Sequence, residues 1–212
     1  MRMMRIPTVV LLLLGAAFSS AAAQEQSALS KTDIGLSLYG ALSKKTSNTG
    51  ETVSPSNSAG AMFELRYLSN PILGLEGTYS YNHADQTYTA TPGGCPVGFT
   101  ACSTTEEIKA AAKQVTVNWV PSLHFANMRI FGELGLGLQR NVPDSGQTNT
   151  QTSTRLVYDY GAGLDFSLLP HIGVRGQYRG NLYKPPQLTN QFPSMDKFTQ
   201  TAEPMLGVYL RL

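Results

Sequence analysis

Histidine is the residue of this chain best suited to acid–base chemistry, and it occurs three times, as His83, His124 and His171. Hydrolysis of an ester would need a histidine beside a serine nucleophile and a carboxylate. His83 lies two residues before Asp85, but none of the three histidines has a serine two residues further along. A histidine and an aspartate this close in a polar segment more often cap a loop than act as a catalytic dyad. We therefore expect no catalytic residues, and no motif predicts a metal or a cofactor.

Arginines and carboxylates form a second set of reactive groups, and they recur at alternate positions of period-two segments. Folding the chain back about the short connections at 69–71 and 169–171 brings Arg66 opposite Glu76, and Asp165 opposite Arg175, within reach of cross-strand ion pairs. The signs nearly balance, as a buried network requires, because an unpaired charge away from water is costly. The other interpretation is a face in contact with water. The predicted network comprises Arg66, Glu76, Arg129, Glu133, Asp159, Asp165, Arg175, Arg179 and Arg211, and Asp33, Glu64 and Glu203 share its face.

Eight period-two segments must position these charges. Their connections alternate between long and short, and a ten-residue strand tilted by about 45° rises roughly 24 Å, close to the apolar height of a membrane barrel. Pro204 is awkward in a closed ladder, so the last strand is expected to start at Met205 or to carry a bulge there. The expected strands are 33–42, 60–67, 75–82, 114–119, 128–139, 156–166, 172–182 and 205–212, with long polar connections at 44–58, 83–111, 141–153 and 184–198.

Alternation alone does not say which face of these strands is inside, because a soluble lipocalin-type barrel has the same period with its apolar face inward. The arginines after residue 23 lie in strands or at their ends, whereas the lysines lie in connections or at strand ends. Arginine suits bidentate pairing in a dry interior. Glycines at 135, 137, 161 and 163 would leave room for long arginines there, or would ease curvature. Aromatic residues of the apolar face lie mostly near strand ends, like an interfacial girdle: Tyr67, Tyr79, Tyr81, Trp119, Tyr158, Phe166 and Tyr178. We therefore expect the apolar face outside.

Composition and the start of the chain agree with a membrane barrel. Charged residues make up 14% of the chain, against roughly 25% in soluble domains, and mean hydropathy is −0.13. Residues 1–23 combine Arg2 and Arg5, an apolar core and a small-residue end, which predicts a cleaved secretory signal peptide before a single domain, 24–212. No basic stripe indicates a nucleic-acid partner. No apolar run after the signal is long enough for a spanning helix.

The two cysteines, Cys95 and Cys102, lie in a Gly/Pro/Thr-rich segment of this exported chain. A disulfide that closes a small loop is the favoured interpretation. A metal or redox site is the alternative, but no histidine or carboxylate lies between the cysteines and their spacing is not CxxC.

The chain ends Met205-Leu206-Gly207-Val208-Tyr209-Leu210-Arg211-Leu212, which is similar to the assembly signal of the small eight-stranded outer-membrane barrels, the superfamily of the outer membrane protein A transmembrane domain and related surface antigens. Leu212 and Met205 depart from that pattern, which usually has Phe and a polar residue there. The resemblance implies an all-β, eight-stranded antiparallel up-and-down transmembrane barrel with short periplasmic turns and long extracellular loops, integral to the bacterial outer membrane. It also implies that Gly207, Tyr209, Leu210 and Leu212 are read by the barrel-insertion machinery.

Three functions are compatible with such a barrel. The first is a non-enzymatic surface protein, in contact with outer-membrane lipid and lipopolysaccharide, whose polar loops serve adhesion, recognition or envelope integrity through a surface ligand. The second is a narrow channel for small solutes, although eight strands leave space only for side chains. The third is a lipid-modifying enzyme similar to lipid A deacylases or palmitoyltransferases, which the histidine positions disfavour. The first is the function we expect.

Overall fold

The computed structural model describes residues 31–48, 51–90, 104–192 and 195–212. Within these ranges no helix is long and apolar enough to cross a membrane. The expected signal peptide at 1–23 and the cysteine pair Cys95 and Cys102 lie outside the described residues. The strands, in chain order, are β1 Thr32–Ser43, β2 Thr46–Asn48, β3 Glu51–Pro55, β4 Ser58–Leu68, β5 Gly74–Ala90, β6 Thr104–Trp119, β7 Ser122–Phe125, β8 Met128–Pro143, β9 Ser153–Ser167, β10 Ile172–Tyr183 and β11 Thr199–Arg211.

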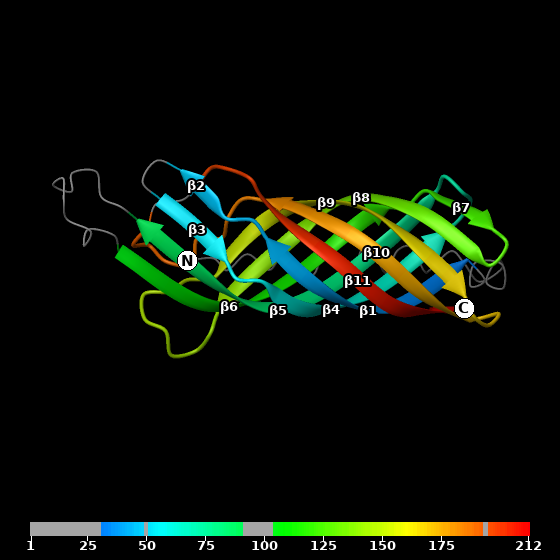
Figure 1. Cartoon of the computed structure of the whole chain (residues 1–212), viewed down its shortest axis with the longest axis horizontal. Coiled ribbons are helices and arrows are strands. Elements are labelled where there is room, and N and C mark those ends of the chain that lie inside the picture. The colour runs from blue at the N-terminus through cyan, green and yellow to red at the C-terminus, as the bar shows by residue number, and fades with distance from the viewer. Residues whose placement is uncertain (1–30, 49–50, 91–103, 193–194) are drawn as a thin grey trace, which may run out of the picture.

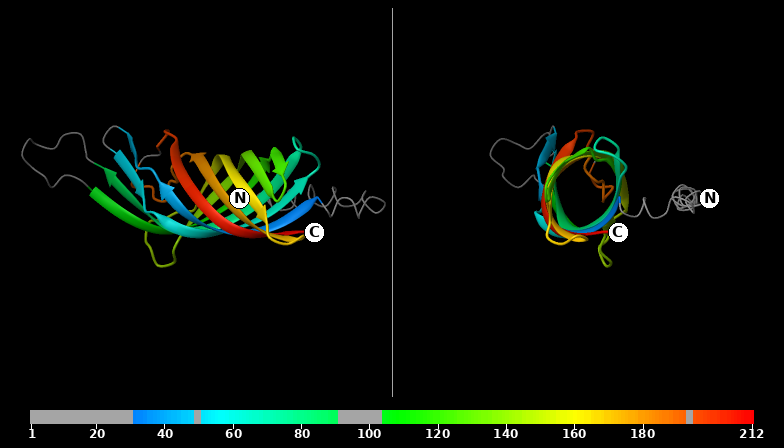
Figure 2. Two further views of the ribbon diagram at one scale, coloured as in Figure 1. Left: turned by 45° about the vertical axis from the view of Figure 1, so that its right-hand side comes forward. Right: turned by 90° about the vertical axis from the view of Figure 1, so that its right-hand side faces the viewer.

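Eight long strands close into one antiparallel barrel. Each pairs with the next long strand along the chain, and β1 pairs with β11 from Asp33 opposite Arg211 to Ser43 opposite Thr201, which closes the ring. The end-on view in Figure 2 shows this closed ring, and Figure 1 shows the strands tilted along its axis. The predicted eight-stranded up-and-down barrel is confirmed. A closed ring leaves no unpaired edge among these strands, which is what a bilayer demands of β-structure.

The apolar face of every long strand points outward. In β4, Met62, Glu64 and Arg66 are buried while Phe63 and Tyr67 are exposed. The same alternation leaves Leu38 69% and Leu206 70% exposed, values that only a hydrocarbon environment makes favourable. The seven aromatic residues expected in the girdle are all exposed on this outer face. The lipocalin-type alternative is therefore wrong for this chain.

The two ends of the barrel differ in their connections. At one end, which we call the short-turn end, tight turns such as 168–171 join the strands, and the backbone N–H of Leu212 donates to Thr32. At the other, the long-loop end, the strands continue past the apolar wall; in Figure 1 it is the end that carries β2 and β3. β1, the first long strand, therefore begins at the short-turn end, and β11, the last, ends there.

The third connection was expected to span 83–111, and this was wrong for most of its length. β5 and β6 pair continuously from Leu75 opposite Trp119 to Ala90 opposite Thr104. Their inward residues there include Tyr88 and Ile108, which are buried. The extension lacks an alternating apolar face because it stands beyond the apolar wall. These residues form strands because β5 and β6 pair with each other. A search for alternating hydrophobic residues therefore does not detect them.

Two further connections also contain strands. The 44–58 connection holds the β2–β3 hairpin, and β3 adds to β5 from Glu51 opposite Ala90 to Pro55 opposite Gln86. The short connection between the strands expected at 114–119 and 128–139 includes β7, which pairs with β8. Neither changes the barrel's strand number, because both are short additions at its ends (Figure 1).

The last strand begins earlier than expected. β11 starts at Thr199, and its register with β10 runs through Pro204, opposite Tyr178, without a bulge. On the β1 side the pairing passes from Tyr39–Met205 to Leu42–Ala202 in one register. Pro204 is exposed on the outer wall. The ladder tolerates the missing N–H because the pairing on the β1 side is interrupted at only two positions, Gly40 opposite Pro204 and Ala41 opposite Glu203.

Candidate functional site

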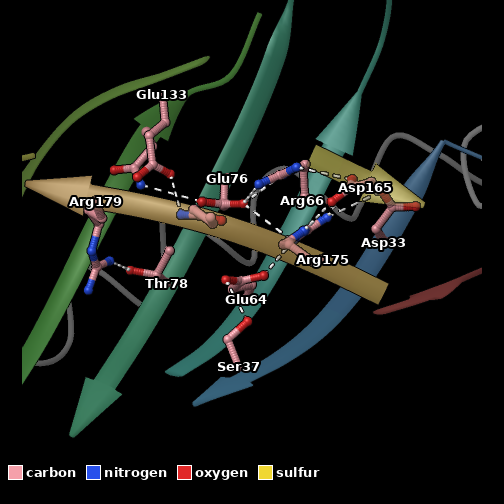
Figure 3. Close-up of polar contacts among 12 residues, drawn as sticks. Asp33, Ser37, Glu64, Arg66, Glu76, Thr78, Glu133, Asp165, Arg175 and Arg179 are labelled. Atoms are coloured by element: carbon pink, nitrogen blue, oxygen red, sulfur yellow. Dashed lines mark hydrogen bonds and ion pairs between the residues drawn. The ribbon is translucent and has the colours of Figure 1, made fainter. Parts of the chain in front are cut away.

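Seven charged side chains fill the barrel interior near the short-turn end, and we call them the ionic plug: Asp33, Glu64, Arg66, Glu76, Arg129, Asp165 and Arg175. They come from β1, β4, β5, β8, β9 and β10, and each is at most 3% exposed. The close-up in Figure 3 shows Arg66 and Arg175 side by side among the carboxylates. Alternation of each strand sends these side chains inward, and the register of the closed barrel brings them to one level.

Arg175 is the centre of the ionic plug. Its Nε donates to Asp165 Oδ1 at 2.7 Å, and its Nη1 donates to Glu64 on the far wall. Glu64 in turn accepts a hydrogen bond from the Ser37 hydroxyl at 3.3 Å. One guanidinium thus links β10 to β9 beside it and to β4 across the lumen (Figure 3).

Arg66 and Arg129 complete the plug on either side. Arg66 Nε donates to Glu76 Oε2 at 2.6 Å, and its guanidinium lies 4.0 Å from the ring centre of Phe131. Arg129 bridges Asp33 and Asp165 from its Nη2 atom. The structure places Arg66 opposite Glu76, and Arg175 opposite Asp165, as folding back about the short turns predicts.

Arg179 forms a second level of the interior, further toward the long-loop end. Its Nε and Nη2 donate to Glu203 Oε2 at 2.9 and 2.8 Å, and its Nη1 donates to the Thr78 hydroxyl at 3.4 Å. The predicted residues Glu133 and Asp159 also lie inside, but neither has an arginine or lysine within ion-pair distance among the described residues. Arg211, the last predicted member, reaches Asp33 at 3.5 Å from a partly exposed position.

The interior charges are arranged so that breaking one pair is costly. Removing one partner of a buried, hydrogen-bonded pair leaves the other charge without compensation, at a cost of about 3–5 kcal/mol. Every arginine of the ionic plug contacts at least two carboxylates. The plug is therefore a mutually dependent set rather than a row of independent ion pairs.

The four interior glycines do not serve arginine as expected. A Cβ at Gly161 would collide with the Glu133 carboxylate, one at Gly135 with the Asn118 amide, and one at Gly163 with the Phe131 ring. At these three glycines the room is taken by the side chain of the residue opposite on the neighbouring strand, whereas a Cβ at Gly137 would collide with the Val115 carbonyl. These glycines thus position Glu133, Asn118 and Phe131, and Phe131 then stacks on Arg66.

An apolar cluster closes the long-loop end, and we call it the mouth cover. Its buried members are Val53, Tyr88, Ile108, Ala110, Leu188, Phe192 and Met195. The last three come from the connection between β10 and β11, drawn in orange against the barrel rim in Figure 2. This segment was expected to be a loop and is one, but the structure tucks its three apolar residues inward, which sequence reasoning did not anticipate.

Hydrogen bonds link three parts of the chain at the mouth cover: β5, the β10–β11 connection and the β8–β9 connection. The Tyr88 hydroxyl donates to the Pro186 carbonyl at 2.6 Å and accepts from the Leu188 N–H at 3.3 Å. The backbone N–H of Gln151 donates to the Leu188 carbonyl at 2.7 Å. Burial beside Leu188 raises the pKa of Tyr88 to about 12, since desolvation disfavours the phenolate.

Between the two closures lies a small polar chamber lined by amide and hydroxyl side chains of Gln114, Gln139, Asn141, Asn181, Tyr183 and Thr201, with Glu203 beside them. Its cavity volume is about 20 Å³. A volume of about 10–15 Å³ on this measure holds one water. The chamber therefore has space for water but none for a solute of metabolite size.

None of the three histidines forms a hydrogen bond with a serine hydroxyl among the described residues. His83 Nε2 lies 3.0 Å from both carboxylate oxygens of Asp144, and not beside Asp85, on the outer wall at the long-loop end. His124 is on β7 and His171 is in a turn, both at the short-turn end. Within the described ranges, no group of three or more His, Cys, Asp or Glu side chains is arranged to hold a metal ion.

The residues of the expected assembly signal divide between the two faces of β11. Tyr209 points inward, where Arg129 and Arg175 lie 5.7 and 5.3 Å from its ring centre and its hydroxyl is 3.0 Å from the Ser167 hydroxyl. Leu210 and Leu212 are exposed on the outer face. A Cβ at Gly207 would collide with Ser37 on β1. Gly207 and Tyr209 thus have packing roles at the closing seam of the barrel.

Comparison with known proteins agrees with this architecture. Residues 9–202 match the family described as the outer membrane protein beta-barrel domain. The chain belongs to this family. It is therefore an integral β-barrel of the bacterial outer membrane with membrane-spanning strands. A search of curated proteins found no match to the chain.

Several solved members of small outer-membrane barrels have similar structures. Neisserial surface protein A matches with a TM-score of 0.54 at 13% identity, covering 86% of this chain and 97% of that one. OprG from Pseudomonas aeruginosa matches with a TM-score of 0.52 at 11% identity, over 84% of this chain and 94% of that one. Ail, the attachment invasion locus protein of Yersinia pestis, matches with a TM-score of 0.48 at 20% identity, over 85% and 97%. At such identities the likeness concerns the fold alone.

Proposed function

We propose that this outer-membrane barrel is a non-conducting, non-enzymatic scaffold that presents its long-loop end at the cell surface for adhesion, recognition or envelope integrity. The observation that carries the proposal is the double closure of the lumen. The ionic plug fills one half and the mouth cover closes the other, with about 20 Å³ between them. A barrel closed twice leaves only its outer surface and its loops for molecular contacts.

The orientation follows from the connections. Outer-membrane barrels have short periplasmic turns and longer extracellular loops, and an even number of strands brings both chain ends to the periplasmic side. In this barrel the short-turn end carries Leu212 and the start of β1. The β5–β6 extension, the β2–β3 hairpin and the mouth cover would then stand outside the cell.

A channel is the weaker proposal because transport needs a continuous aqueous path. Eight strands enclose a space just wide enough for side chains. Here interior charges contact one another across the lumen, as Arg175 does with Glu64. Ions would have to break these contacts to pass.

Planar-bilayer recording tests the proposal, with four proteins compared at equal insertion. We expect no stable single-channel conductance from the wild type, from Arg175→Ala or from a variant with 186–192 replaced by a Gly/Ser linker. The two closures act in series, so only the combination of both changes should conduct. Stable conductance of the wild-type barrel would contradict the proposal and favour the small-solute channel.

Three earlier predictions belong to this proposal and have direct tests. Cleavage after residue 23 would appear as the N-terminal mass of the protein purified from outer membranes. A Cys95–Cys102 disulfide would raise the intact mass of the protein by two hydrogen atoms on reduction. Reading of Gly207, Tyr209, Leu210 and Leu212 by the insertion machinery would make Leu212→Ala fold more slowly in cells, seen as less of the heat-modifiable band, but at an unchanged rate in detergent.

A further inference from the structure

Two cations stand directly opposite each other on the outer wall near the long-loop end. Lys113 on β6 pairs in register with Arg140 on β8. Both side chains are exposed, and neither makes a hydrogen bond or an ion pair with any described residue. Like charges at directly opposite positions of a sheet are destabilising. The pair therefore costs the barrel stability unless an anion lies against it.

No residue of the described ranges supplies that anion. Tyr81 is opposite Lys113 on β5, and Thr154 is opposite Arg140 on β9. The nearest acidic residues stand two outward-facing rows further from the membrane, level with Lys109, and have partners there: Asp144 contacts His83, and Asp85 is opposite Lys109. Glu107 lies further out still, opposite Thr87.

Other cations at this end are used differently. Lys44 donates to the Gln200 side chain, Lys184 pairs with Asp196, and Lys197 donates to the Ser47 carbonyl. Each of these lysines thus has a partner within the described part of the protein. Lys113 and Arg140 instead lie exposed on the outer wall of two long strands, where no described part of a connection covers them.

The height of the pair on the wall indicates what faces it. The next outward residues toward the membrane are Val115 and Leu138, 49% and 53% exposed, flanked by Tyr79 and Leu156, each 45% exposed. These residues form the last ring of the apolar wall. Two residues along a tilted strand rise about 5 Å. The cations therefore stand in the layer of lipid headgroups, just above the hydrocarbon.

We propose that Lys113 and Arg140 bind the phosphate group of a phosphorylated glycolipid, of the lipopolysaccharide class, in the leaflet at the long-loop end. Arginine offers a planar fork that matches phosphate oxygens, and lysine adds a compact charge. One phosphate between the two side chains would turn their mutual repulsion into two attractions. Tyr81 beside Lys113 would face the same headgroup, as aromatic residues do at this depth. The inference rests on the proposed function, because it needs the long-loop end to face outward.

Native mass spectrometry of the purified barrel in detergent tests this, by counting bound lipid during titration with lipid A. Wild-type protein is compared with the double variant Lys113→Ala/Arg140→Ala. The matched control is Lys31→Ala/Lys45→Ala, which removes two exposed lysines elsewhere, one of them at the short-turn end. Two near-surface cations correspond to about a thirtyfold change in binding. We expect that loss in the first variant and an unchanged affinity in the control.

Three further arms identify the chemistry. Enzymatically dephosphorylated lipid A should bind the wild type as weakly as phosphorylated lipid A binds the double variant. Inorganic phosphate at millimolar concentration should not displace the lipid, because the acyl chains also contact the wall. Equal binding of the dephosphorylated lipid, displacement by free phosphate, or an equal loss in the control variant would each overturn the inference.

The orientation is checked separately with an epitope inserted at Gly146, in the connection between β8 and β9. Antibody binding to intact cells is expected. An inaccessible epitope would overturn both this inference and the proposed function, whereas failure of lipid A binding with an accessible epitope and a silent bilayer would overturn the inference alone.

Discussion

The barrel is closed twice by unlike chemistry. The ionic plug near the short-turn end joins three arginines to four carboxylates that come from strand positions, with contacts such as Arg66 Nε to Glu76 at 2.6 Å. The mouth cover at the long-loop end joins apolar side chains from the β5–β6 extension, β3 and the β10–β11 connection. Both closures are buried, but one is held by paired charges and the other by packing and a few hydrogen bonds.

The difference shows how each closure depends on its surroundings. The ionic plug is surrounded by the barrel wall, which is itself surrounded by lipid. Water therefore cannot solvate its charges, and they must compensate one another. The mouth cover stands beyond the apolar wall, where water is available when it opens. We therefore expect loss of a plug residue to destabilise the whole barrel, and loss of a cover residue to affect local opening first.

The largest effect is expected from Arg175→Ala. This change leaves Glu64 and Asp165 buried without their shared cation and should cost about 3–5 kcal/mol of the free energy of unfolding. Urea unfolding in detergent micelles measures it. Lys31→Ala, at an exposed lysine near the short-turn end, is the control and should stay within about 0.5 kcal/mol of wild type. Equal small effects in both variants would mean that water solvates the charges of the ionic plug. That result would contradict the difference expected between the two closures.

Leu188→Ala is expected to have the next largest effect, but on a different quantity. Leu188 is fully buried in the mouth cover, and loss of such a side chain costs about 2–5 kcal/mol where the site cannot collapse. Hydrogen exchange at the Gln151 and Leu188 amides should accelerate, while the urea midpoint of the barrel stays close to wild type. Leu168→Ala, at an exposed turn residue, should change neither. A lowered barrel midpoint in Leu188→Ala would show that the two closures form one cooperative unit.

Two glutamates inside the barrel sharpen the comparison further. Glu76→Gln removes the charge that pairs with Arg66 and should cost about 2 kcal/mol, because a hydrogen bond to a charged group is worth about 1.5–3 kcal/mol. Glu133→Gln should be neutral or stabilising, since Glu133 has no ion-pair partner among the described residues and its Oε2 already accepts from the Gln177 amide at 2.8 Å. Urea unfolding of the two variants side by side measures both. Equal destabilisation would indicate that Glu133 has a charge partner that the structure does not record.

Tyr88→Phe should have the smallest effect, about 1 kcal/mol on opening of the mouth cover, because it removes one hydrogen-bonded hydroxyl. The raised pKa of about 12 gives the same residue a pH signature. The buried neutral phenol contributes stability that is complete below the unfolded pKa of about 10 and is lost as the pH rises toward 12. Hydrogen exchange of the Leu188 amide, corrected for intrinsic base catalysis, should therefore show opening above pH 10 in wild type but not in Tyr88→Phe. An identical profile in both would assign the alkaline opening to another group.

Much of the barrel could be predicted because a strand exposes its pattern every two residues. Alternation along β4 predicts that Phe63 and Tyr67 point outward while Glu64 and Arg66 point inward. The Arg66–Glu76 and Asp165–Arg175 pairs follow from the length of one short turn each. Contacts across a long connection could not be predicted in this way. The bridge from Arg175 to Glu64 depends on the closure and tilt of the whole ring, which no local spacing reports.

The amino-acid sequence by itself determined the strand number, the outward apolar face, the end of the molecule at which the short turns lie and the set of charges that points inward. These are periodic or local properties, so each is determined by residues that are close together in the sequence. Only the tertiary structure decided that β5 and β6 continue to Ala90 and Thr104, that Leu188 and Phe192 fold over the mouth, and that Lys113 meets Arg140 with no acid beside them. Those features join residues far apart in the chain, and their energies come from burial and register, which exist only once the ring has closed.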